Sequence, residues 1–491
     1  MSQIAPNAEA RRPATRAPGR HEPAAPAPVT LDVFRSLERE HDFRPLRAEG
    51  AVPPGLRGTL YRNGPSVFDA GVDPHWFDGT GAVSAVRFTD GGAEGAVRVL
   101  HTPSADGDAG RRGASFGAYG QKMSWRRRLA ALFGGQSLRN VANINVLAWQ
   151  KRTFAFYEST LPLEIDPVTL RSIGETDLGG VVAKGMNAHP HRVPARRATY
   201  QTGLRVGPKV LLDLFELPDE GAARLLTSVE LPGVMEAHDF FATRDHLVLV
   251  LPPLWCSSLA MLVDGGFASS LRWRPEEGTR VIVIPIDEPE RRVVLDTDAL
   301  WYWHGVNAFE RPDGRIELDL VGYQDFASNA AWIETVTRGG LTTGNGSSVR
   351  RAVIDKEARR VSWEERWPHA CEFGSVSPAF ASQAARVAWL AGYPQGDEGR
   401  ALWSRIVRLD LQSGDAQRID PGTRGLVSEP VVVPRSERED DVWVLAYVHD
   451  QNAGATFLGI WDGARPEHDA VARVWFDQQL PPTLHGTFVR A

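Results

Sequence analysis

Cysteine is almost absent from this sequence, since only Cys256 and Cys371 occur among its 491 residues. Two cysteines so far apart exclude a disulfide framework and a CxxC zinc site, and they fit a reducing compartment. Apolar runs are short, with none of the roughly 18 residues that a membrane-spanning helix needs. The N-terminus lacks the apolar stretch of a secretory signal. We therefore expect a cytoplasmic protein.

An excess of positive charge is also missing. The formal net charge is -6, so no global basic field exists to attract phosphate, and nucleic acid is excluded as a partner. With 42% hydrophobic and 24% charged residues, the composition is that of an ordinary globular protein with enough length for a large core.

Large apolar residues are scarce at the N-terminus, where residues 1–30 consist mainly of Pro, Ala and Arg. Such a segment cannot bury enough surface to offset the entropy of ordering, so we predict a disordered tail there and a single domain over residues 31–491. The domain contains short apolar runs such as GRIELDLVGY (314–323) and DVWVLAYVHD (441–450). Strict alternation and Asp-Gly punctuation indicate strands joined as hairpins.

Helical periodicity is rare. Many short strands without alternating helices predict an all-β fold, either a propeller or a stacked sandwich. The sequence contains no clean repeat that would decide between the two architectures.

Two segments differ from this strand pattern, KMSWRRRLAALFGG (122–135) and residues 251–275. The second segment is predicted to expose Leu254, Trp255 and several other apolar side chains in a connection between strands. Apolar residues beside arginine suit a segment that lies on a membrane surface. A helix packed on the face of the fold explains the same pattern equally well.

Four histidines occur at the starts of strand-like runs, namely His189, His238, His304 and His485. Ligands that converge from separate strands onto one metal would be distributed in this way along the chain. A single buried histidine is nevertheless more often structural than metal-binding, and the spacing alone does not make these four residues ligands.

Ordered sequence blocks provide stronger information. GTLYRNGP (58–65) and HWFDGTGAVSAVRF (75–88) are followed by LEIDPVTL, NAHPH, AHDF, GTRVIVIPID, HGVNAFE, CEFGSVSP, SEPVVVPR, EDDVWVLAYVHD and LHGTFV. From about residue 45 to the end, the chain resembles the carotenoid cleavage oxygenases, a family with retinoid and stilbene-cleaving relatives. This resemblance implies a seven-bladed β-propeller capped by loops and a few short helices.

The resemblance also implies one iron(II) ion on the propeller axis, held by His189, His238, His304 and His485. Three glutamates of the family map onto Glu158, Glu372 and Glu429, and we expect them to serve His238, His304 and His485 respectively, leaving His189 without a carboxylate. Neutral imidazoles suit iron, and a carboxylate that accepts the other ring N–H fixes the tautomer and orientation of the ring. Four ligands on an octahedral ion leave two positions open for dioxygen.

The sequence departs from the family pattern at three places. Thr80 and Ala82 stand in FDGTGA, where the family usually has FDGDGM. This change is expected to alter the packing of a loop near the cavity. Ile144 occupies the place of a threonine or valine beside an open coordination position, which we expect its larger side chain to shield. Tyr157 stands where the stilbene-cleaving branch has a lysine that grips a phenolate, which speaks against a stilbene substrate.

The implied activity is oxidative cleavage of a carbon–carbon double bond in a carotenoid or apocarotenoid, with dioxygen as co-substrate and aldehyde or ketone products. Cleavage of a phenolic stilbene is the alternative, and metal-dependent isomerohydrolysis of a retinyl ester is a third possibility. A propeller that only binds a lipophilic ligand would have no reason to retain all seven histidines and glutamates. We expect a monomer with a lipophilic polyene substrate, possible contact with a membrane surface, and no nucleic-acid partner.

Overall fold

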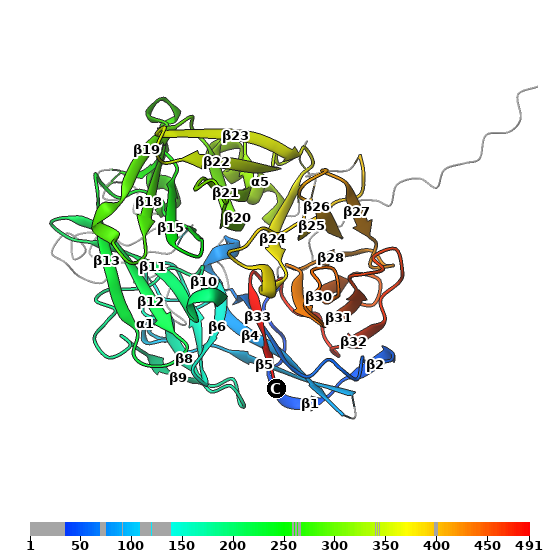
Figure 1. The fold of residues 1–491 in the computed structure, drawn as a ribbon. Helices are drawn as coiled ribbons and strands as arrows, with labels where there is room; N and C mark the ends of the chain where they lie inside the picture. The colour runs from blue at the N-terminus through cyan, green and yellow to red at the C-terminus, as the bar shows by residue number, and fades with distance from the viewer. Residues whose placement is uncertain are drawn as a thin grey trace, which may run out of the picture.

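The computed structural model describes residues 35–68, 75–90, 92–108, 119, 139–257, 260, 263, 267–338, 340, 342, 344–396 and 401–491. The expected tail (1–30) and the arginine-rich segment 122–135 lie outside these residues. Seen along its axis, the described chain forms a ring of twisted antiparallel sheets, with one strand of each sheet lining the centre (Figure 1). The fold is a seven-bladed β-propeller.

The first blade contains β33 (Gly486–Arg490), β3 (Gly58–Val67), β4 (Thr80–Thr89), β5 (Gly92–Val99) and β1 (His41–Pro45). The second contains β6 (Asn145–Trp149), β7 (Arg152–Phe156), β8 (Leu163–Ile165) and β9 (Ser172–Glu175). The third contains β10 (His191–Val193), β11 (Ala198–Val206), β12 (Val210–Pro218) and β13 (Arg224–Leu231). The fourth contains β14 (Phe241–Ala242), β15 (His246–Leu251), β18 (Thr279–Pro285) and β19 (Val293–Thr297).

The fifth blade contains β20 (Trp301–Glu310), β21 (Ile316–Tyr323), β22 (Ser348–Asp355) and β23 (Arg360–Trp367). The sixth contains β24 (Cys371–Val376), β25 (Val387–Gly392), β26 (Arg405–Asp410) and β27 (Ala416–Ile419). The seventh contains β28 (Gly425–Val427), β29 (Val431–Pro434), β30 (Val442–Asp450), β31 (Ala455–Asp462), β32 (Ala472–Trp475) and β2 (Arg47–Gly50).

Pairing between the two ends of the chain closes the ring. The C-terminal strand β33 pairs with β3, with Gly58 opposite Arg490, and the N-terminal strand β2 pairs with β32, with Arg47 opposite Trp475. The C-terminal strand thus belongs to the first blade and the N-terminal strand to the seventh. Hydrogen bonds therefore close the ring in addition to the packing between blades. Closure of this kind also removes free sheet edges.

Alternating apolar residues fill the spaces between neighbouring blades. One core cluster joins the third and fourth blades through residues such as Leu212, Leu249 and Ile284, and another joins the first and seventh through Leu60, Leu445 and Leu458. Side chains on one face of a strand repeat every second residue, so both faces of a blade become buried when blades stack around an axis. This packing fixes the inner strands that carry the site.

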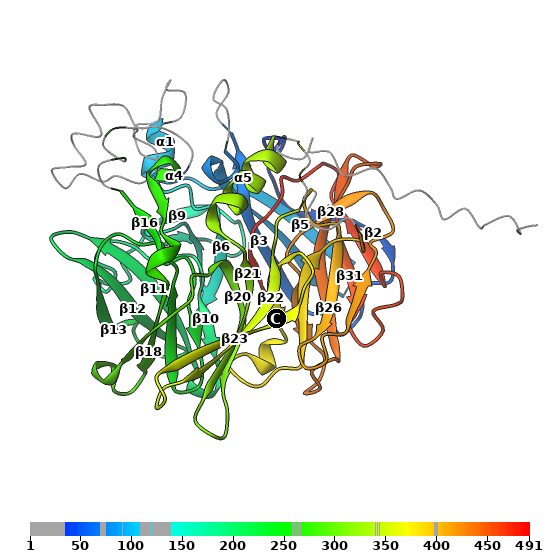
Figure 2. The ribbon, with the colours of Figure 1, turned by 90° about the horizontal axis from the view of Figure 1, so that it is seen from above.

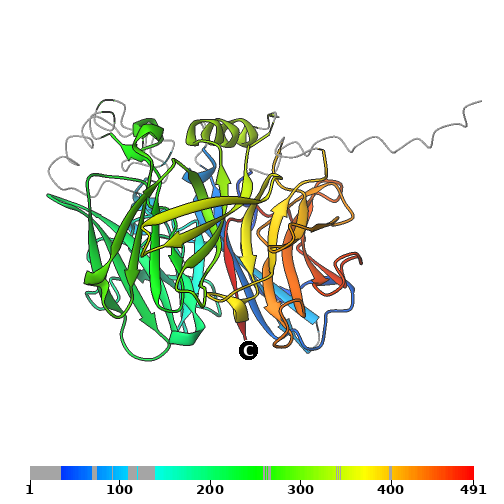
Figure 3. The same ribbon diagram turned by 45° about the horizontal axis from the view of Figure 1, so that its top comes forward.

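Short helices cover one end of the propeller, where α1 (Pro103–Asp108), α4 (Phe267–Ser270) and α5 (Phe326–Thr337) lie on the same face (Figures 2 and 3). The segment 251–275 reaches this face through the hairpin of β16 (Leu254–Cys256) and β17 (Leu271–Trp273). The prediction that Leu254 is exposed is wrong, because its side chain is fully buried in the largest core cluster. Trp255 is half-buried. Within the described residues, no helix is long and apolar enough to cross a bilayer.

Candidate metal centre

The four predicted histidines lie at the inner ends of different blades. His189 lies two residues before β10, His238 precedes β14, His304 lies within β20, and His485 immediately precedes β33. A break in the pairing of β20 with β21 between Tyr302 and Gly305 surrounds His304. Such bulges redirect a side chain away from the regular pleat. The propeller thus brings together residues that are up to 296 positions apart in the chain.

The imidazole rings form a compact cluster centred on His189. Its ring centroid lies 4.2 Å from that of His238, 5.1 Å from that of His304 and 4.9 Å from that of His485. Potential ligand atoms of His189, His304 and His485 all lie within 4.8 Å of one another, and a second such group consists of Glu158, His189 and His238. The two groups share His189 and together form one candidate metal centre.

The three predicted glutamates surround this cluster. Glu372 Oε2 lies 2.6 Å from His304 Nδ1, and Glu429 Oε1 lies 2.9 Å from His485 Nδ1. Glu158 Oε1 lies 3.1 Å from His238 Nδ1 and 3.6 Å from His189 Nε2. The closest histidine of each glutamate is therefore the one expected from the sequence, and the longer distance to His189 is not that of a hydrogen bond.

Burial and neighbouring charge act against each other on these carboxyl groups. Burial by itself would raise the pKa of Glu158, but His238 and His189 outweigh it and hold the pKa at about 2. For Glu429, burial is likewise outweighed, by His485 and by the guanidinium of Arg62, with a resulting pKa of about 2. The pKa of Glu372 is also lowered, chiefly by His304 against the effect of burial. The carboxylates are thus ionised and able to accept ring N–H groups.

The arrangement fits a divalent metal ion. Because Nδ1 of His304 and of His485 each faces a carboxylate, their Nε2 atoms present lone pairs, and these two atoms lie 3.1 Å apart. Two nitrogens at right angles around one ion, each at the usual metal–imidazole distance, are separated by about 3.0 Å. The buried Nε2 of His189 has no hydrogen-bond partner. A cation between the rings would satisfy all three atoms.

Sequence reasoning missed three residues that hold the carboxylates. Arg62, with 1% of its side chain exposed, donates from Nη1 to Glu429 Oε2 at 2.6 Å. The Tyr323 hydroxyl donates to Glu372 Oε1 at 2.8 Å, and the backbone N–H of Phe373 donates to Glu372 Oε2 at 2.6 Å. Arg62 lies inside the block GTLYRNGP, but its role depends on partners more than 360 residues away, which local sequence does not reveal.

Two backbone positions beside the glutamates are unusual. Ser159, which follows Glu158, has φ of 53°, and Phe373, which follows Glu372, has φ of 54°. Residues other than glycine rarely adopt this left-handed conformation, and its cost is commonly tolerated at functional sites. The Phe373 ring stacks against His304 with 5.2 Å between centroids. Strained backbone here orients both a carboxylate and an aromatic wall.

The remaining predicted positions lie near the cluster. Ile144 is buried, and its carbonyl accepts the backbone N–H of His485 at 3.1 Å. Tyr157 is buried, and burial raises the pKa of its hydroxyl well above the ordinary value, so the side chain stays neutral. His191, two residues after His189, instead shares a 2.7 Å hydrogen bond with Asp239.

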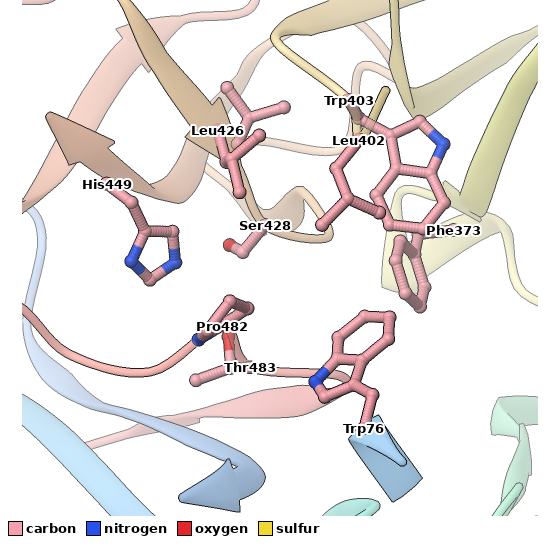
Figure 4. Close-up of a pocket in the computed structure, with 10 residues that line it drawn as sticks. Trp76, Phe373, Leu402, Trp403, Leu426, Ser428, His449, Pro482 and Thr483 are labelled. Atoms are coloured by element: carbon pink, nitrogen blue, oxygen red, sulfur yellow. The ribbon is translucent and has the colours of Figure 1, made fainter. Parts of the chain in front are cut away.

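A small cavity lies behind Phe373 (Figure 4). Its lining includes Trp76, Trp403, Ser428 and the fully buried His449. Because the ring of Phe373 stacks on His304 and also lines this cavity, the cavity adjoins the metal centre without containing its ligand atoms.

Comparison with known proteins identifies the family. The family model described as "Retinal pigment epithelial membrane protein" matches residues 34–490, and similar proteins include an apocarotenoid-15,15'-oxygenase and a carotenoid cleavage oxygenase. The chain belongs to the carotenoid cleavage oxygenase family. Membership agrees with the propeller and with the position of the histidine cluster at its centre.

Relatives in the carotenoid cleavage oxygenase family act on different substrates. The chain is 28% identical to the apocarotenoid-15,15'-oxygenase of Synechocystis over 94% of its own length and 96% of the relative. It is 25% identical to resveratrol cleavage oxygenase 1 of Aspergillus fumigatus, covering 92% and 93% of the two chains. It is 26% identical to isoeugenol monooxygenase of Pseudomonas nitroreducens, covering 94% and 98%.

A solved structure supports the same assignment. Cobalt-substituted Synechocystis ACO superposes with a TM-score of 0.82 at 27% identity, covering 93% of this chain and 98% of the other. The protein is therefore an enzyme of an oxygenase family that cleaves carbon–carbon double bonds, with a histidine-rich metal site of the kind that holds non-haem iron in that family.

Proposed function

We propose that this protein is a non-haem iron(II) dioxygenase that cleaves one carbon–carbon double bond of a carotenoid or apocarotenoid, giving two carbonyl products. The observation that carries the proposal is the cluster of His189, His304 and His485, joined by His238, with carboxylates behind the rings. The relation to the apocarotenoid oxygenase over nearly the whole chain supports the substrate class.

In this proposal, the four histidines hold one iron ion through their ring nitrogens. Bound iron(II) supplies the place at which dioxygen is activated next to the alkene. Glu372 and Glu429 accept the Nδ1–H groups of His304 and His485, which fixes the tautomers so that Nε2 faces the ion. Such carboxylates also raise the basicity of the ligand.

Surrounding apolar groups keep water away from the reacting alkene. The Trp303 ring contacts His238 edge-on with 4.8 Å between centroids, and Phe373 covers His304 from another direction. A dry site of this kind prevents side reactions of reactive intermediates. No side chain is required to transfer a proton, because the balanced reaction adds both atoms of dioxygen to the two alkene carbons.

Ile144 is proposed to shield one of the two open coordination positions. Its carbonyl accepts the backbone N–H of His485 and its side chain is buried, which supports a place for it beside the proposed ligand. Replacing Ile144 with valine or threonine should open this position. We expect the change to alter turnover while leaving the iron content unchanged.

Iron analysis and product analysis together test the proposal. The purified protein is assayed for iron and then incubated aerobically with carotenoids, apocarotenoids, resveratrol and isoeugenol. Near-stoichiometric iron and shortened aldehydes or ketones from the polyenes, with both oxygen atoms derived from labelled dioxygen, are expected. Cleavage of resveratrol or isoeugenol alone would replace the substrate class, and protein without iron would overturn the mechanism.

A further inference from the structure

Side-chain hydrogen bonds join the third and fourth blades beside the proposed ligands His189 and His238. Two residues before His189, the amide group of Asn187 donates to the Ala237 carbonyl at 2.7 Å, next to His238 in the chain. Asn187 is itself buried, and the Ser159 hydroxyl donates to its side-chain oxygen at 3.0 Å. The backbone that leads into His238 is therefore held from the third blade.

Asp239 follows His238 directly and contacts both neighbouring blades. Its Oδ1 lies 2.7 Å from Nε2 of His191, the first residue of β10 in the third blade. Its Oδ2 accepts the backbone N–H of Gly305 in β20 of the fifth blade at 2.7 Å, one residue after His304. One carboxylate thus connects the fourth blade to the third and to the fifth, each time beside a proposed ligand.

The fifth blade approaches Asp239 closely because Gly305 has no side chain. A Cβ atom at this position would lie 2.5 Å from the Phe241 ring, whereas packed carbon atoms are about 3.5–4.0 Å apart. The Tyr302 hydroxyl lies 2.9 Å from the Asp239 carbonyl. Strand β20 therefore contacts Asp239 on both sides of His304.

Both oxygens of the Asp239 side chain accept hydrogen bonds. The residue is 4% exposed, and its Oδ1 accepts the backbone N–H of Phe240 at 2.7 Å in addition to the His191 ring. A carboxylate offers only acceptors, whereas an amide of the same shape offers one acceptor and one donor group. Asparagine would place its NH₂ group against the N–H of Gly305 or against that of Phe240. The donors around this position therefore favour a carboxylate.

We propose that Asp239 is a positioning residue of the metal centre. By joining the residues beside three of the ligands, it sets the separation of His189, His238 and His304. These histidines come from different blades, so a change in blade spacing moves their rings relative to one another, and a metal site tolerates only about 0.5 Å of such movement. The three glutamates orient single rings, whereas Asp239 fixes the distances between the segments that carry them. This inference rests on the proposed binding of iron by the histidine cluster and is independent of the substrate.

Asp239→Asn tests this role because it keeps the shape of the side chain and removes one acceptor. Iron(II) affinity of the full chain is measured by competition with a chelator, and ligand geometry by the visible absorption of cobalt(II) added to metal-free protein. We expect Asp239→Asn to bind iron(II) about 10- to 100-fold more weakly than the wild type and to change the cobalt spectrum. A loss of stability alone would not change the spectrum of the folded protein.

Asp319→Asn is the matched control. Asp319 is also buried, and both of its oxygens accept hydrogen bonds at 2.7 Å, but both donors belong to Arg351 rather than to residues beside a ligand. We expect this variant to have a lower denaturation midpoint while it keeps the iron affinity and the cobalt spectrum of the wild type. An equal loss of iron affinity in both variants would overturn the inference, because the effect would then follow stability.

His191→Phe and His191→Gln examine the same contact from its other partner. Phenylalanine keeps an aromatic ring beside Phe240, which lies 4.7 Å from the His191 ring between centroids, but it has no N–H to donate to Asp239. It should weaken iron binding, and glutamine should restore part of the affinity because its amide is a donor. These two variants decide the question if Asp239→Asn does not fold.

The outcomes separate this inference from the proposed function. Wild-type iron affinity and an unchanged cobalt spectrum in folded Asp239→Asn, or in His191→Phe where Asp239→Asn does not fold, would overturn the positioning role and leave the metal centre in place. Wild-type protein that binds neither iron(II) nor cobalt(II) would overturn the proposed metal centre, and the positioning role with it.

Discussion

Replacing Arg62 with methionine should weaken both the fold and the metal centre. In β3, the Arg62 side chain donates to Glu429 at 2.6 Å, to the Leu484 carbonyl at 2.8 Å and to the Thr483 hydroxyl at 3.2 Å. With iron(II) bound, the metal and Arg62 together would balance the negative charge of the three glutamates. Methionine has a similar length but no charge, so Glu429 would become an uncompensated buried anion beside His485.

Removing one partner of a buried ion pair usually costs about 3–5 kcal/mol of unfolding free energy. Loss of a group that orients a metal ligand typically weakens metal affinity by about 10- to 100-fold. Denaturant titration measures the first effect, and competition for iron with a chelator measures the second. We expect Arg62→Met to show both changes, with Arg62→Lys intermediate, because lysine keeps the charge but not the forked geometry.

Arg351→Met is the matched control. Arg351 is also buried and forms a two-point pair with Asp319, with both distances 2.7 Å, in the fifth blade. Its loss should reduce stability by a similar amount without weakening iron binding specifically. Equal iron affinities in the two variants would refute the view that Arg62 acts on the metal centre through Glu429.

Three further predictions follow from buried groups near the axis. Tyr323→Phe removes one donor to Glu372, a loss of about 1.5–3 kcal/mol for a bond to a charged group, and chelator competition should show weaker iron binding; unchanged stability and affinity would contradict this. Stripping the metal with a chelator should lower the thermal midpoint, and adding iron(II) back should restore it, since a ligand that binds the folded state stabilises it. Burial lowers the pKa of His449 from 6.5 to about 4, so the unfolded chain takes up a proton between these values that the folded protein does not. Stability is therefore lost as pH falls through this window, by up to about 3 kcal/mol; His449→Leu should flatten the pH dependence of the denaturation midpoint.

Short sequence blocks identified the histidines and glutamates because each of these residues stands inside its own recognisable motif. The strand pattern alone left a propeller and a sandwich open, since alternation shows that strands pair but not that the sheets form a ring. Closure depends on the pairing of β33 with β3 across most of the chain, and the resemblance supplied what the pattern did not. The fold class was thus predictable, but from ordered motifs rather than from periodicity.

Contacts between distant segments could not be predicted in the same way. Leu254 was expected at the surface because it lies in an apolar connection, yet β16 and β17 fold it into the aromatic core. Arg62 and Tyr323 are ordinary strand residues in the sequence, and only the stacking of blades brings them to Glu429 and Glu372. A residue that acts through a partner in another blade leaves no local signal.

The three carboxylates are not restrained equally by their hydrogen-bond partners. Glu429 is held by Arg62, and Glu372 by the Tyr323 hydroxyl and the Phe373 N–H. Within the described part of the chain, the ion-pair partners of Glu158 are His238 at 3.1 Å and His189 at 3.6 Å. The side of the centre that carries His304 and His485 is thus braced more firmly than the side that carries His238. A change at Arg62 or Tyr323 should therefore weaken iron affinity more than a change at Tyr157.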